Sequence, residues 1–552
     1  MAPRPGAWAI ATPSGSVCPP PSPSEPLRRN EMASSTYCWA AVIAYSLLMV
    51  CVGYWTRLRA TGDQEHLGLE FWIARRQLPG WRLGMSLTAG WLMLGWIGFG
   101  MGQTYLFGAT GLWILPIPWL LLCFVILAMV PFVRRIPAVS LPQAIEQRFG
   151  APARVLLAVF SIFVFTAWTQ AETFMAGTLM SGFLGVEPWV CMVLLIAPII
   201  FYTVMGGFRA VAMTDVIQFL IMAVFMIALA VAAVGAAGRA SGGDILGALR
   251  KATPPSSGEG QVFNLWFNGL LFPVVLLIGY LPGWMTEQDL LLRIQAARTT
   301  REAMKGAVLA FGLIAVFVIA LPTLAAFCAL VAFPPVNGAP PEAVGADGTK
   351  IITAFLAPLP VALQVFALVG IVACQMSTVD TFANVTAMPL SHDLIEPVLR
   401  KRGAAERTRV AVARGVTVFV LLVALGCALI SEKLGDVYYI SSGVLSASIA
   451  VPAIFVFWKR TTSAAVIAAA LAGFVTTVGL YWYEMKYLQA AEKLPELLQK
   501  SYGYLYVAAG VVVSAVLILV VSLLTPAPPP EQVAAVRERP VDDFGEFSSR
   551  AW

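Results

Sequence analysis

Long apolar runs recur along almost the whole chain, separated by short polar stretches. We count about thirteen, each of roughly 18 or more residues, which is the length that a helix needs to cross a bilayer. Because backbone groups in lipid must bond to one another, these runs predict helices and not open strands. The expected spans are 36–55, 80–108, 112–132, 154–183, 188–205, 210–237, 262–284, 307–333, 357–388, 410–430, 437–458, 462–483 and 503–525.

Two of these runs contain residues that interrupt helices. GMSLTAGWLMLGWIGFGMGQ has six glycines between Gly84 and Gly102, and the run ending IGYLPGWMTEQ has Gly279, Pro282 and Gly283. Glycine and proline weaken a continuous helix, so we expect both runs to break mid-membrane. They lie five helices apart and so cross the bilayer in opposite directions, as in secondary transporters built from two inverted halves. The alternative is that the small residues only allow close helix packing.

The composition agrees with a membrane protein. Of the 552 residues, 59% are hydrophobic and 12% are charged, whereas soluble proteins average about 25% charged residues. The eight cysteines form no CxxC pair and the two histidines no HExxH motif, so neither a disulfide framework nor a zinc protease is indicated. The net charge of +6 comes without a basic patch interleaved with aromatics, which argues against nucleic-acid binding.

Basic residues gather in alternate loops. This bias predicts a multi-pass protein of the cell (inner) membrane with its N-terminus outside and its C-terminus in the cytoplasm. The inner loops would hold Arg57, Arg59, Arg75, Arg76, Arg82, Arg134, Arg135, Arg148, Arg209, Arg293, Arg298, Arg301, Lys305, Arg400, Lys401, Arg402, Arg407, Arg409, Lys459 and Arg460.

Acidic residues lie inside or beside several runs. Glu172, Asp215 and Asp380 fall within expected helices, where ionisable groups are costly and usually functional. Glu287 and Asp289 follow the seventh run, and we expect them to reach cytoplasmic water as ordinary surface charges.

One helix face within QMSTVDTFANVT is lined with oxygen atoms. Ser377, Asp380, Thr381 and Asn384 are spaced i, i+3, i+4 and i+7, and Thr378 flanks them. Such oxygens suit a hard cation such as Na⁺, whose remaining ligands we expect from backbone carbonyls at a broken helix.

Two alternative roles for this face stay open. Ser and Thr hydroxyls can bond to carbonyls of their own helix, which accounts for the hydroxyls but not for Asp380. Alternatively, Asp380 and Asp215 share or relay a proton, since two neighbouring carboxylates favour holding one proton between them.

Two motifs carry a family resemblance. GGFRAVAMTDVIQ (206–218) and ACQMSTVDTFANVT (373–386), with weaker matches in RIQAARTTREA and FWKR, resemble the sodium:solute symporter family over about residues 33–525. The resemblance implies an all-α integral membrane protein with a LeuT-like 5+5 inverted repeat, one extra N-terminal helix and two extra C-terminal helices.

The same resemblance implies a division of the chain. Residues 1–32 would be a disordered extension or a mis-assigned start, and 33–79 an extra helix with a cytoplasmic loop. The two five-helix repeats would be 80–240 and 262–460. Residues 461–525 would be two further helices, and 526–552 a disordered cytoplasmic tail.

Na⁺ is the coupling ion that the resemblance implies. Carried over by position, its ligands are the carbonyls of Ala89, Leu92 and Cys374 and the side chains of Ser377 and Thr378. Asp215, Asp380 and Thr381 fall at the positions of a second Na⁺ site or an ion exit. The carboxylate of Asp380 departs from the hydroxyl that is usual there.

A small organic solute is the implied substrate. Its expected contacts are Trp91, Trp96, Gln170, Glu172, Tyr280, Trp284, Tyr438 and Tyr439, although aromatic residues within a helix also serve for packing alone. Trp91 replaces the aspartate of many proline-type members, and the glutamate and glutamine pattern of sugar-type members is absent. These departures argue against proline and sugar, and leave a carboxylate, an amino-acid-like or a heterocyclic solute open.

The function expected is a sodium-coupled secondary symporter that imports a small organic solute by alternating access. One alternative is a proton-coupled symporter that uses Asp380 or Glu172. A solute sensor without transport is another. The chain has no Ser/His pair, metal-ligand cluster or phosphate loop that would indicate an enzyme. The pattern leaves the oligomeric state open.

Overall fold

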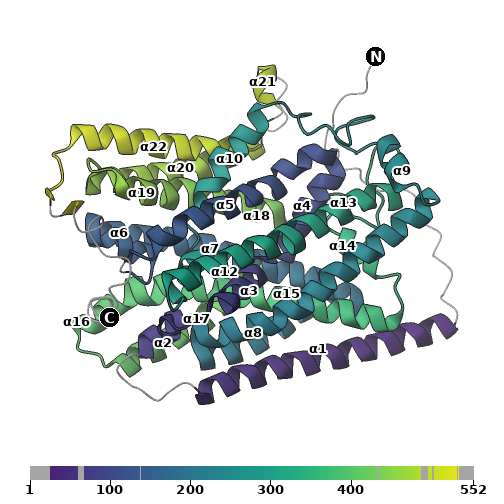
Figure 1. Cartoon of the computed structure of the whole chain (residues 1–552), viewed down its shortest axis with the longest axis horizontal. Coiled ribbons are helices and arrows are strands. Elements are labelled where there is room, and N and C mark those ends of the chain that lie inside the picture. Colours follow the sequence, from purple (N-terminus) through teal and green to yellow (C-terminus); the bar gives the residue numbers. More distant parts are fainter. Residues whose placement is uncertain are drawn as a thin grey trace.

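The computed structural model describes residues 25–59, 67–136, 138–431, 434–486, 495–499, 501, 503–530 and 532–533. Within these ranges the regular structure is helical, with two isolated β-bridges. The long helices lie side by side in a bundle (Figure 1). Helix α1 (Glu25–Arg59) follows one edge, and α20 (Ser463–Lys486) packs with α22 (Leu505–Leu524) at the opposite edge. The predicted all-α architecture is confirmed.

The other helices follow in chain order. They are α2 (Leu67–Ile73), α3 (Gly80–Trp91), α4 (Leu94–Phe107), α5 (Pro116–Val133), α6 (Leu141–Phe149), α7 (Ala151–Leu184), α8 (Pro188–Ser241), α9 (Ile245–Lys251), α10 (Leu271–Trp284), α11 (Gln288–Ala296), α12 (Thr300–Leu313), α13 (Leu321–Ala332), α14 (Ile351–Leu356), α15 (Val361–Met388), α16 (Glu396–Lys401), α17 (Glu406–Leu429), α18 (Leu434–Val444), α19 (Val451–Ile454) and α21 (Glu496–Gln499). Short π-helical stretches at Ile314–Ala320, Pro389–Ile395 and Leu445–Ala450 continue α12, α15 and α18.

The thirteen expected spans correspond to three kinds of element. Among the described residues, eleven helices are long and apolar enough to cross a membrane, and the bent pair α3–α4 makes a twelfth span. The remaining expected span is the shorter apolar helix α10. Helix α1 begins at Glu25, inside the stretch 1–32 that was expected to precede the fold. Residues 1–24 and 534–552 lie outside the described part of the chain.

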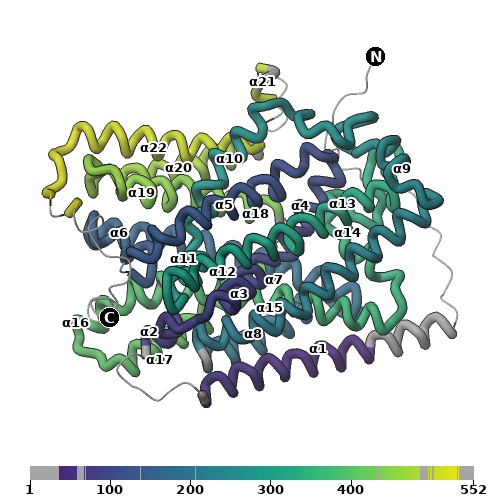
Figure 2. The backbone as a smooth tube through the Cα atoms, viewed as in Figure 1, coloured from purple at the N-terminus to yellow at the C-terminus, as the bar shows by residue number. Residues whose placement is uncertain are grey.

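The glycine-rich run breaks as predicted. Helix α3 ends at Trp91, α4 begins at Leu94, and the two are bent by 60°. Leu92 and Met93 between them have extended or irregular backbone. Helix α3 packs against α8 and α15, so this break lies beside the segment that carries the predicted oxygen-lined face (Figure 2).

The seventh run also breaks, but its bounds differ from the prediction. Residues 262–270 form turns, including a glycine with φ of +76° at Gly269, so α10 begins only at Leu271. After Trp284 the chain turns and continues as α11. The end of α11 is tied to the start of α3, because the Leu78 N–H bonds to the Ala296 carbonyl at 3.0 Å.

Glu287 and Asp289 are therefore not surface charges, contrary to the prediction. They are 5% and 0% exposed, respectively. The reason is that α11 folds back into the protein as the second half of the broken helix. Arg293 lies on the same helix and is also buried, as are Arg134 and Arg148, which the charge pattern had placed in water. Arg134 instead donates to the carbonyls of Gln295 and Ala297 and so holds the end of α11.

Helix α8 joins two runs that were expected to be separate spans. The joint is Gly207, whose φ of +57° and ψ of −157° lie outside helical values. This region of backbone is nearly restricted to glycine. A Cβ there would lie 2.8 Å from the carbonyl oxygen of Phe71 on α2. The kink thus depends on a close approach that only glycine permits.

Replacing Gly207 by alanine is expected to destabilise the folded protein by about 2–4 kcal/mol, through backbone strain and the clash with Phe71. The measurement is the thermal unfolding midpoint of purified protein in detergent. Gly235→Ala on the same helix is the control, since a Cβ there would only reach Arg239 Nη1 at 3.5 Å. Equal midpoints for the two variants would contradict the requirement for glycine at the kink.

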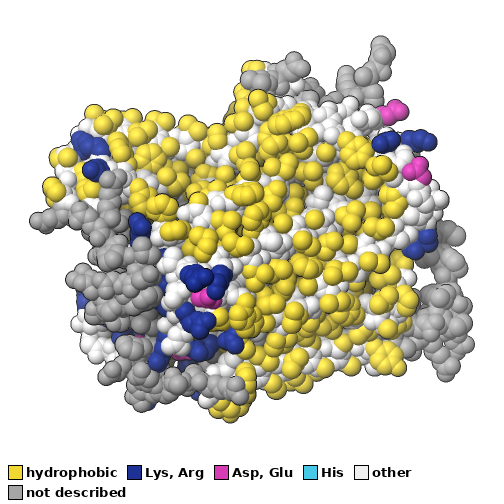
Figure 3. Space-filling view, viewed as in Figure 1, with side chains coloured by type: hydrophobic (Ala, Val, Ile, Leu, Met, Phe, Trp, Pro, Cys, Tyr) yellow, Lys and Arg dark blue, Asp and Glu magenta, His cyan; other side chains and the backbone are white. Residues whose placement is uncertain are grey.

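The outer face of the bundle suits a bilayer. Figure 3 shows hydrophobic side chains across most of one face, with many of the visible Lys and Arg gathered at the end where Figure 2 places α2 and α11. Exposed large side chains on the long helices include Leu47, Phe124, Phe201, Val231 and Phe419. Such a belt cannot face water over this area, because exposed apolar patches on soluble proteins are smaller.

Candidate functional site

The oxygen-lined face of α15 is fully enclosed by protein. Helix α15 packs against α7, α8 and α3, and Ser377, Thr378 and Asp380 have no exposed surface. Ser377 Oγ donates to Asp215 Oδ1 on α8 at 2.6 Å rather than to its own helix. Thr386, further along the same helix, bonds back to the Phe382 carbonyl. Back-bonding therefore explains Thr386 but not Ser377, whose hydroxyl faces a neighbouring helix.

The two segments that carry the predicted Na⁺ ligands pack against each other near the first break. Ala89 and Leu92 at the end of α3, and Cys374, Ser377 and Thr378 on α15, all have no exposed surface. The two segments touch, because a Cβ on Gly90 would lie 3.1 Å from Thr381 Oγ1. The Thr378 hydroxyl has no hydrogen-bond partner among the described residues. An unbonded buried hydroxyl is costly unless a ligand uses it.

A carboxylate from α7 caps the second half of the broken helix. Glu172, which is fully buried, accepts the N–H of Gly95 at 3.0 Å and the N–H of Trp96 at 3.3 Å. In a continuous helix these amides would bond to the carbonyls of Trp91 and Leu92. The break therefore directs two amides at Glu172 and removes the helical partners of two carbonyls beside the predicted ion site.

Arg293 is a buried charged residue at this site that the sequence interpretation missed. Its guanidinium is 1% exposed and lies between α8, α11 and α15. Nη2 donates to Thr381 Oγ1 at 2.9 Å and lies 3.3 Å from Asp215 Oδ2. Nη1 lies 3.6 Å from Asp289 Oδ2. The signal in the sequence was the i, i+4 spacing of Asp289 and Arg293. This spacing places the two opposite charges side by side on a helix, so that they can pair when the helix is buried.

Arg293 occupies part of the position predicted for a second Na⁺ or an ion exit. Asp215 and Thr381, predicted as ligands of a second Na⁺ or an ion exit, are joined by the guanidinium of Arg293. Ser86 on α3 completes the group by donating to Asp215 Oδ2 at 2.5 Å. Asp380 points elsewhere and accepts the Tyr202 hydroxyl at 2.5 Å. A fixed positive charge thus sits where two of the three predicted ligands meet.

Most of the predicted substrate residues form one aromatic cluster between α4, α10 and α18, which we call the aromatic cluster. Trp96 lies at its centre, with ring centroids 4.8 Å from Tyr438, 5.9 Å from Tyr439 and 6.3 Å from Trp284. Tyr280 stacks on Trp284 at 5.3 Å. Glu172 joins the cluster by accepting the Tyr438 hydroxyl. These six residues therefore pack together in a single region beside the first break.

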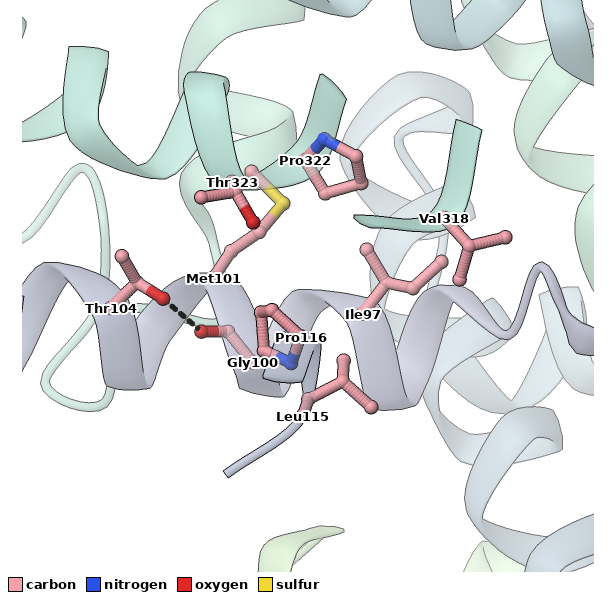
Figure 4. Close-up of a pocket in the computed structure, with 9 residues that line it drawn as sticks. All are labelled: Ile97, Gly100, Met101, Thr104, Leu115, Pro116, Val318, Pro322 and Thr323. Atoms are coloured by element: carbon pink, nitrogen blue, oxygen red, sulfur yellow. Dashed lines mark hydrogen bonds between the residues drawn. The ribbon is translucent and has the colours of Figure 1, made fainter. Parts of the chain in front are cut away.

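The other two predicted contacts lie apart from the aromatic cluster. Trp91 donates through Nε1 to Asp289 at 2.8 Å and so ties the end of α3 to α11. Gln170 donates to Ser431, just beyond the end of α17. A small recess between α4, α5 and α13 is lined by none of the predicted residues (Figure 4). Its lining is apolar except for Thr104 and Thr323, and Thr104 bonds to the Gly100 carbonyl.

Comparisons with known proteins bear on the family and the fold. The model of the sodium:solute symporter family matches residues 71–473. The chain is 27% identical over 463 residues to the sodium/glucose cotransporter of Vibrio parahaemolyticus, covering 78% of this chain and 82% of that protein. It is 23% identical over 452 residues to the high-affinity proline transporter PutP of Bacillus subtilis, covering 78% of this chain and 89% of that protein.

The fold has a solved counterpart. A Na⁺-coupled sialic acid symporter in a substrate-bound outward-open state matches with a TM-score of 0.66 at 17% identity, covering 89% of this chain and 99% of that chain. At this identity the likeness establishes the fold, and the predicted LeuT-type fold class is confirmed.

Proposed function

Because the chain belongs to the sodium:solute symporter family, and is thus a sodium-coupled symporter, we propose that its coupling ion binds where the α3–α4 break meets α15. The ligands would be the carbonyls of Ala89, Leu92 and Cys374 and the hydroxyls of Ser377 and Thr378. The observation that carries this proposal is the buried Thr378 hydroxyl, which lacks a hydrogen-bond partner among the described residues and lies on a helix that packs against the broken α3.

A small organic solute would be imported together with the ion. Na⁺ can drive the cycle only if it binds one conformation better than the other. A site shared by two separate helices, α3 and α15, meets this condition, since it loses ligands when the helices move apart. With the N-terminus outside and the C-terminus in the cytoplasm, inward Na⁺ movement gains about 2.3 kcal/mol per charge per 100 mV.

The route of ion release would pass Asp215. This carboxylate already bonds to Ser377, a proposed Na⁺ ligand, and to Arg293 on the other side. It can therefore accept Na⁺ from the site while Arg293 remains paired with Asp289. We favour this ion-exit role over a second Na⁺ site, because Arg293 already supplies a cation between Asp215 and Thr381.

NaCl is expected to raise the thermal unfolding midpoint of purified protein above that in equimolar KCl. A ligand that binds only the folded state stabilises it by about 2.7 kcal/mol at one hundred times its Kd. The double variant Ser377→Ala with Thr378→Ala should lose this Na⁺-specific shift and Na⁺-driven solute uptake.

Thr386→Ala is the matched control for this experiment. Its hydroxyl lies on the same helix and is equally buried, but it bonds back to Phe382. It should keep the Na⁺ shift. A wild-type protein without a Na⁺-specific shift or Na⁺-dependent uptake would overturn the proposed ion site.

A further inference from the structure

Resting on the proposed symport function, we propose that the transported solute is a small organic cation, with its ammonium group held between Glu172 and the rings of Trp96, Tyr280, Trp284 and Tyr439. Four features of the described residues carry this assignment: the helix ends, the buried charges, the ring arrangement and the unbonded hydroxyls.

Each of the two helix ends that could attract an anionic solute already has a carboxylate of the protein beside it or in its first turn. The N-terminus of a half-helix carries partial positive charge and binds anionic groups. At α4 this position is taken by Glu172, which accepts the N–H groups of Gly95 and Trp96. At α11 the first turn carries Asp289, which accepts the Trp91 indole. A solute carboxylate would therefore meet a like charge at either break.

The buried charges around the two breaks favour a cation. Glu172, Asp215, Glu287, Asp289 and Asp380 are all buried here. Arg293 is paired with Asp215 and Asp289, and none of the ion pairs between described residues includes Glu172. A buried carboxylate with only neutral donors lacks a counter-charge, which makes its burial costly. A solute ammonium beside Glu172 would complete it.

Glu172 lies directly against the aromatic cluster. It bonds to Tyr438, whose ring centroid lies 4.8 Å from that of Trp96. Gly95 allows this approach, since a Cβ there would lie 2.9 Å from Glu172 Oε1. The Glu172 carboxylate therefore contacts Tyr438, and the ring of Tyr438 in turn lies against Trp96.

The rings themselves are of the kind that binds organic cations. Trp, Tyr and Phe faces attract ammonium groups within about 6 Å, most strongly for Trp and when water is excluded. Trp96 and Trp284 lie at 78° to each other, Tyr280 stacks on Trp284, and Tyr439 lies 5.7 Å from Tyr280. In this structure the rings pack on one another, so the solute would enter when the helices that carry them, α4, α10 and α18, separate.

Two hydroxyls in the aromatic cluster, those of Tyr280 and Tyr439, have no hydrogen-bond partner among the described residues. Tyr280 has no exposed surface, and its hydroxyl makes no hydrogen bond within the described part of the chain. Buried tyrosine hydroxyls normally find a partner. A hydroxyl or amine on the solute, next to its cationic centre, would supply one.

The test uses the intact protein in NaCl and four probes. Three have a similar shape and different charge: choline, its neutral isostere 3,3-dimethylbutanol and the anion 3,3-dimethylbutanoate. The fourth, butylamine, carries a primary ammonium. Choline or butylamine is expected to raise the unfolding midpoint in NaCl more than in KCl, while the neutral and anionic probes leave it unchanged. Glu172→Gln and Trp284→Leu should each weaken the cation's apparent affinity at least about tenfold.

One control variant and one additional test variant accompany these measurements. Phe124→Leu changes an aromatic residue that is 56% exposed on α5 and should bind the cation normally. Tyr280→Phe removes only one hydroxyl, so it tests the aromatic cluster should Glu172→Gln fail to fold. A shift by 3,3-dimethylbutanol or 3,3-dimethylbutanoate equal to that by choline would overturn the proposal. So would the absence of any cation shift while the Na⁺ shift persists, which would leave the proposed function standing. Loss of the Na⁺ shift itself would instead count against the ion site.

Discussion

Replacing Arg293 by alanine is expected to abolish Na⁺-driven uptake and to lower the free energy of unfolding by about 3–5 kcal/mol. The guanidinium is the shared partner of Asp215 and Asp289, and it also bonds to Ser86 and Thr381. Removing it leaves two buried carboxylates without a counter-charge. The measurements are the unfolding midpoint in detergent and solute uptake into proteoliposomes under a Na⁺ gradient.

Arg298→Ala is the matched control for this variant. Arg298 lies five positions further along the chain, but its side chain is 57% exposed and pairs only weakly with Glu302 at 4.0 Å. Exposed pairs of this kind contribute about 0–1 kcal/mol. Arg293→Lys keeps a charge but cannot contact Asp215, Asp289 and Thr381 at once, so it should retain the fold better than it retains uptake. If Arg293→Ala unfolded no earlier than Arg298→Ala, Arg293 could not be the shared partner of the buried acids.

The first break and the oxygen-lined face of α15 illustrate what local sequence can predict. The six glycines between Gly84 and Gly102 weaken one helix enough that its interruption is a property of the run itself. The oxygen-lined face of α15 follows from residue spacing alone, because a helix brings i, i+3 and i+4 to one side. Both features depend on neighbours in the chain, and both were found in the structure.

The second break shows what the local sequence could not predict. The apolar run ends at Trp284, and acidic residues follow, which is also how a span ends at a membrane surface. What keeps α11 inside the protein lies elsewhere in the chain: Leu78 and Arg134 bond to its end, and Asp215 and Thr381 bond to Arg293. The burial of α11 depends on partners that are distant in the sequence. The only local indication of it is the i, i+4 spacing of Asp289 and Arg293.

The hydrogen-bond partners of Glu172 could not be predicted from the sequence either. Its position in an apolar helix marked it as functional. The role of helix cap came only from the 60° bend, which turns the amides of Gly95 and Trp96 toward α7. The direction in which a broken helix points is a tertiary property, since it depends on what packs against each half.

Replacing Asp380 by asparagine is expected to raise the Na⁺ concentration for half-maximal stabilisation and uptake by roughly tenfold to a hundredfold, while both still require Na⁺. Asp380 Oδ2 accepts the Tyr202 hydroxyl at 2.5 Å, and Oδ1 has no partner among the described residues. Its carboxylate would therefore act through the protein interior on the ion that Ser377 and Thr378 would hold. A unit charge about 8 Å away contributes about 2 kcal/mol at an effective dielectric constant of about 20.

Two comparisons separate this charge effect from proton coupling. Tyr202→Phe keeps the carboxylate but removes its donor, so it should lower stability by about 1.5–3 kcal/mol with a smaller change in Na⁺ affinity. Uptake driven by a pH gradient in Na⁺-free buffer is expected to be absent in wild type, because the proposed coupling site binds Na⁺ through hydroxyls and carbonyls that carry no titratable proton. If wild-type protein did take up solute under a pH gradient alone, and Asp380→Asn lost that uptake, the coupling ion would be the proton. Asp380, with one oxygen bonded to Tyr202 and the other without a partner among the described residues, would then be its carrier.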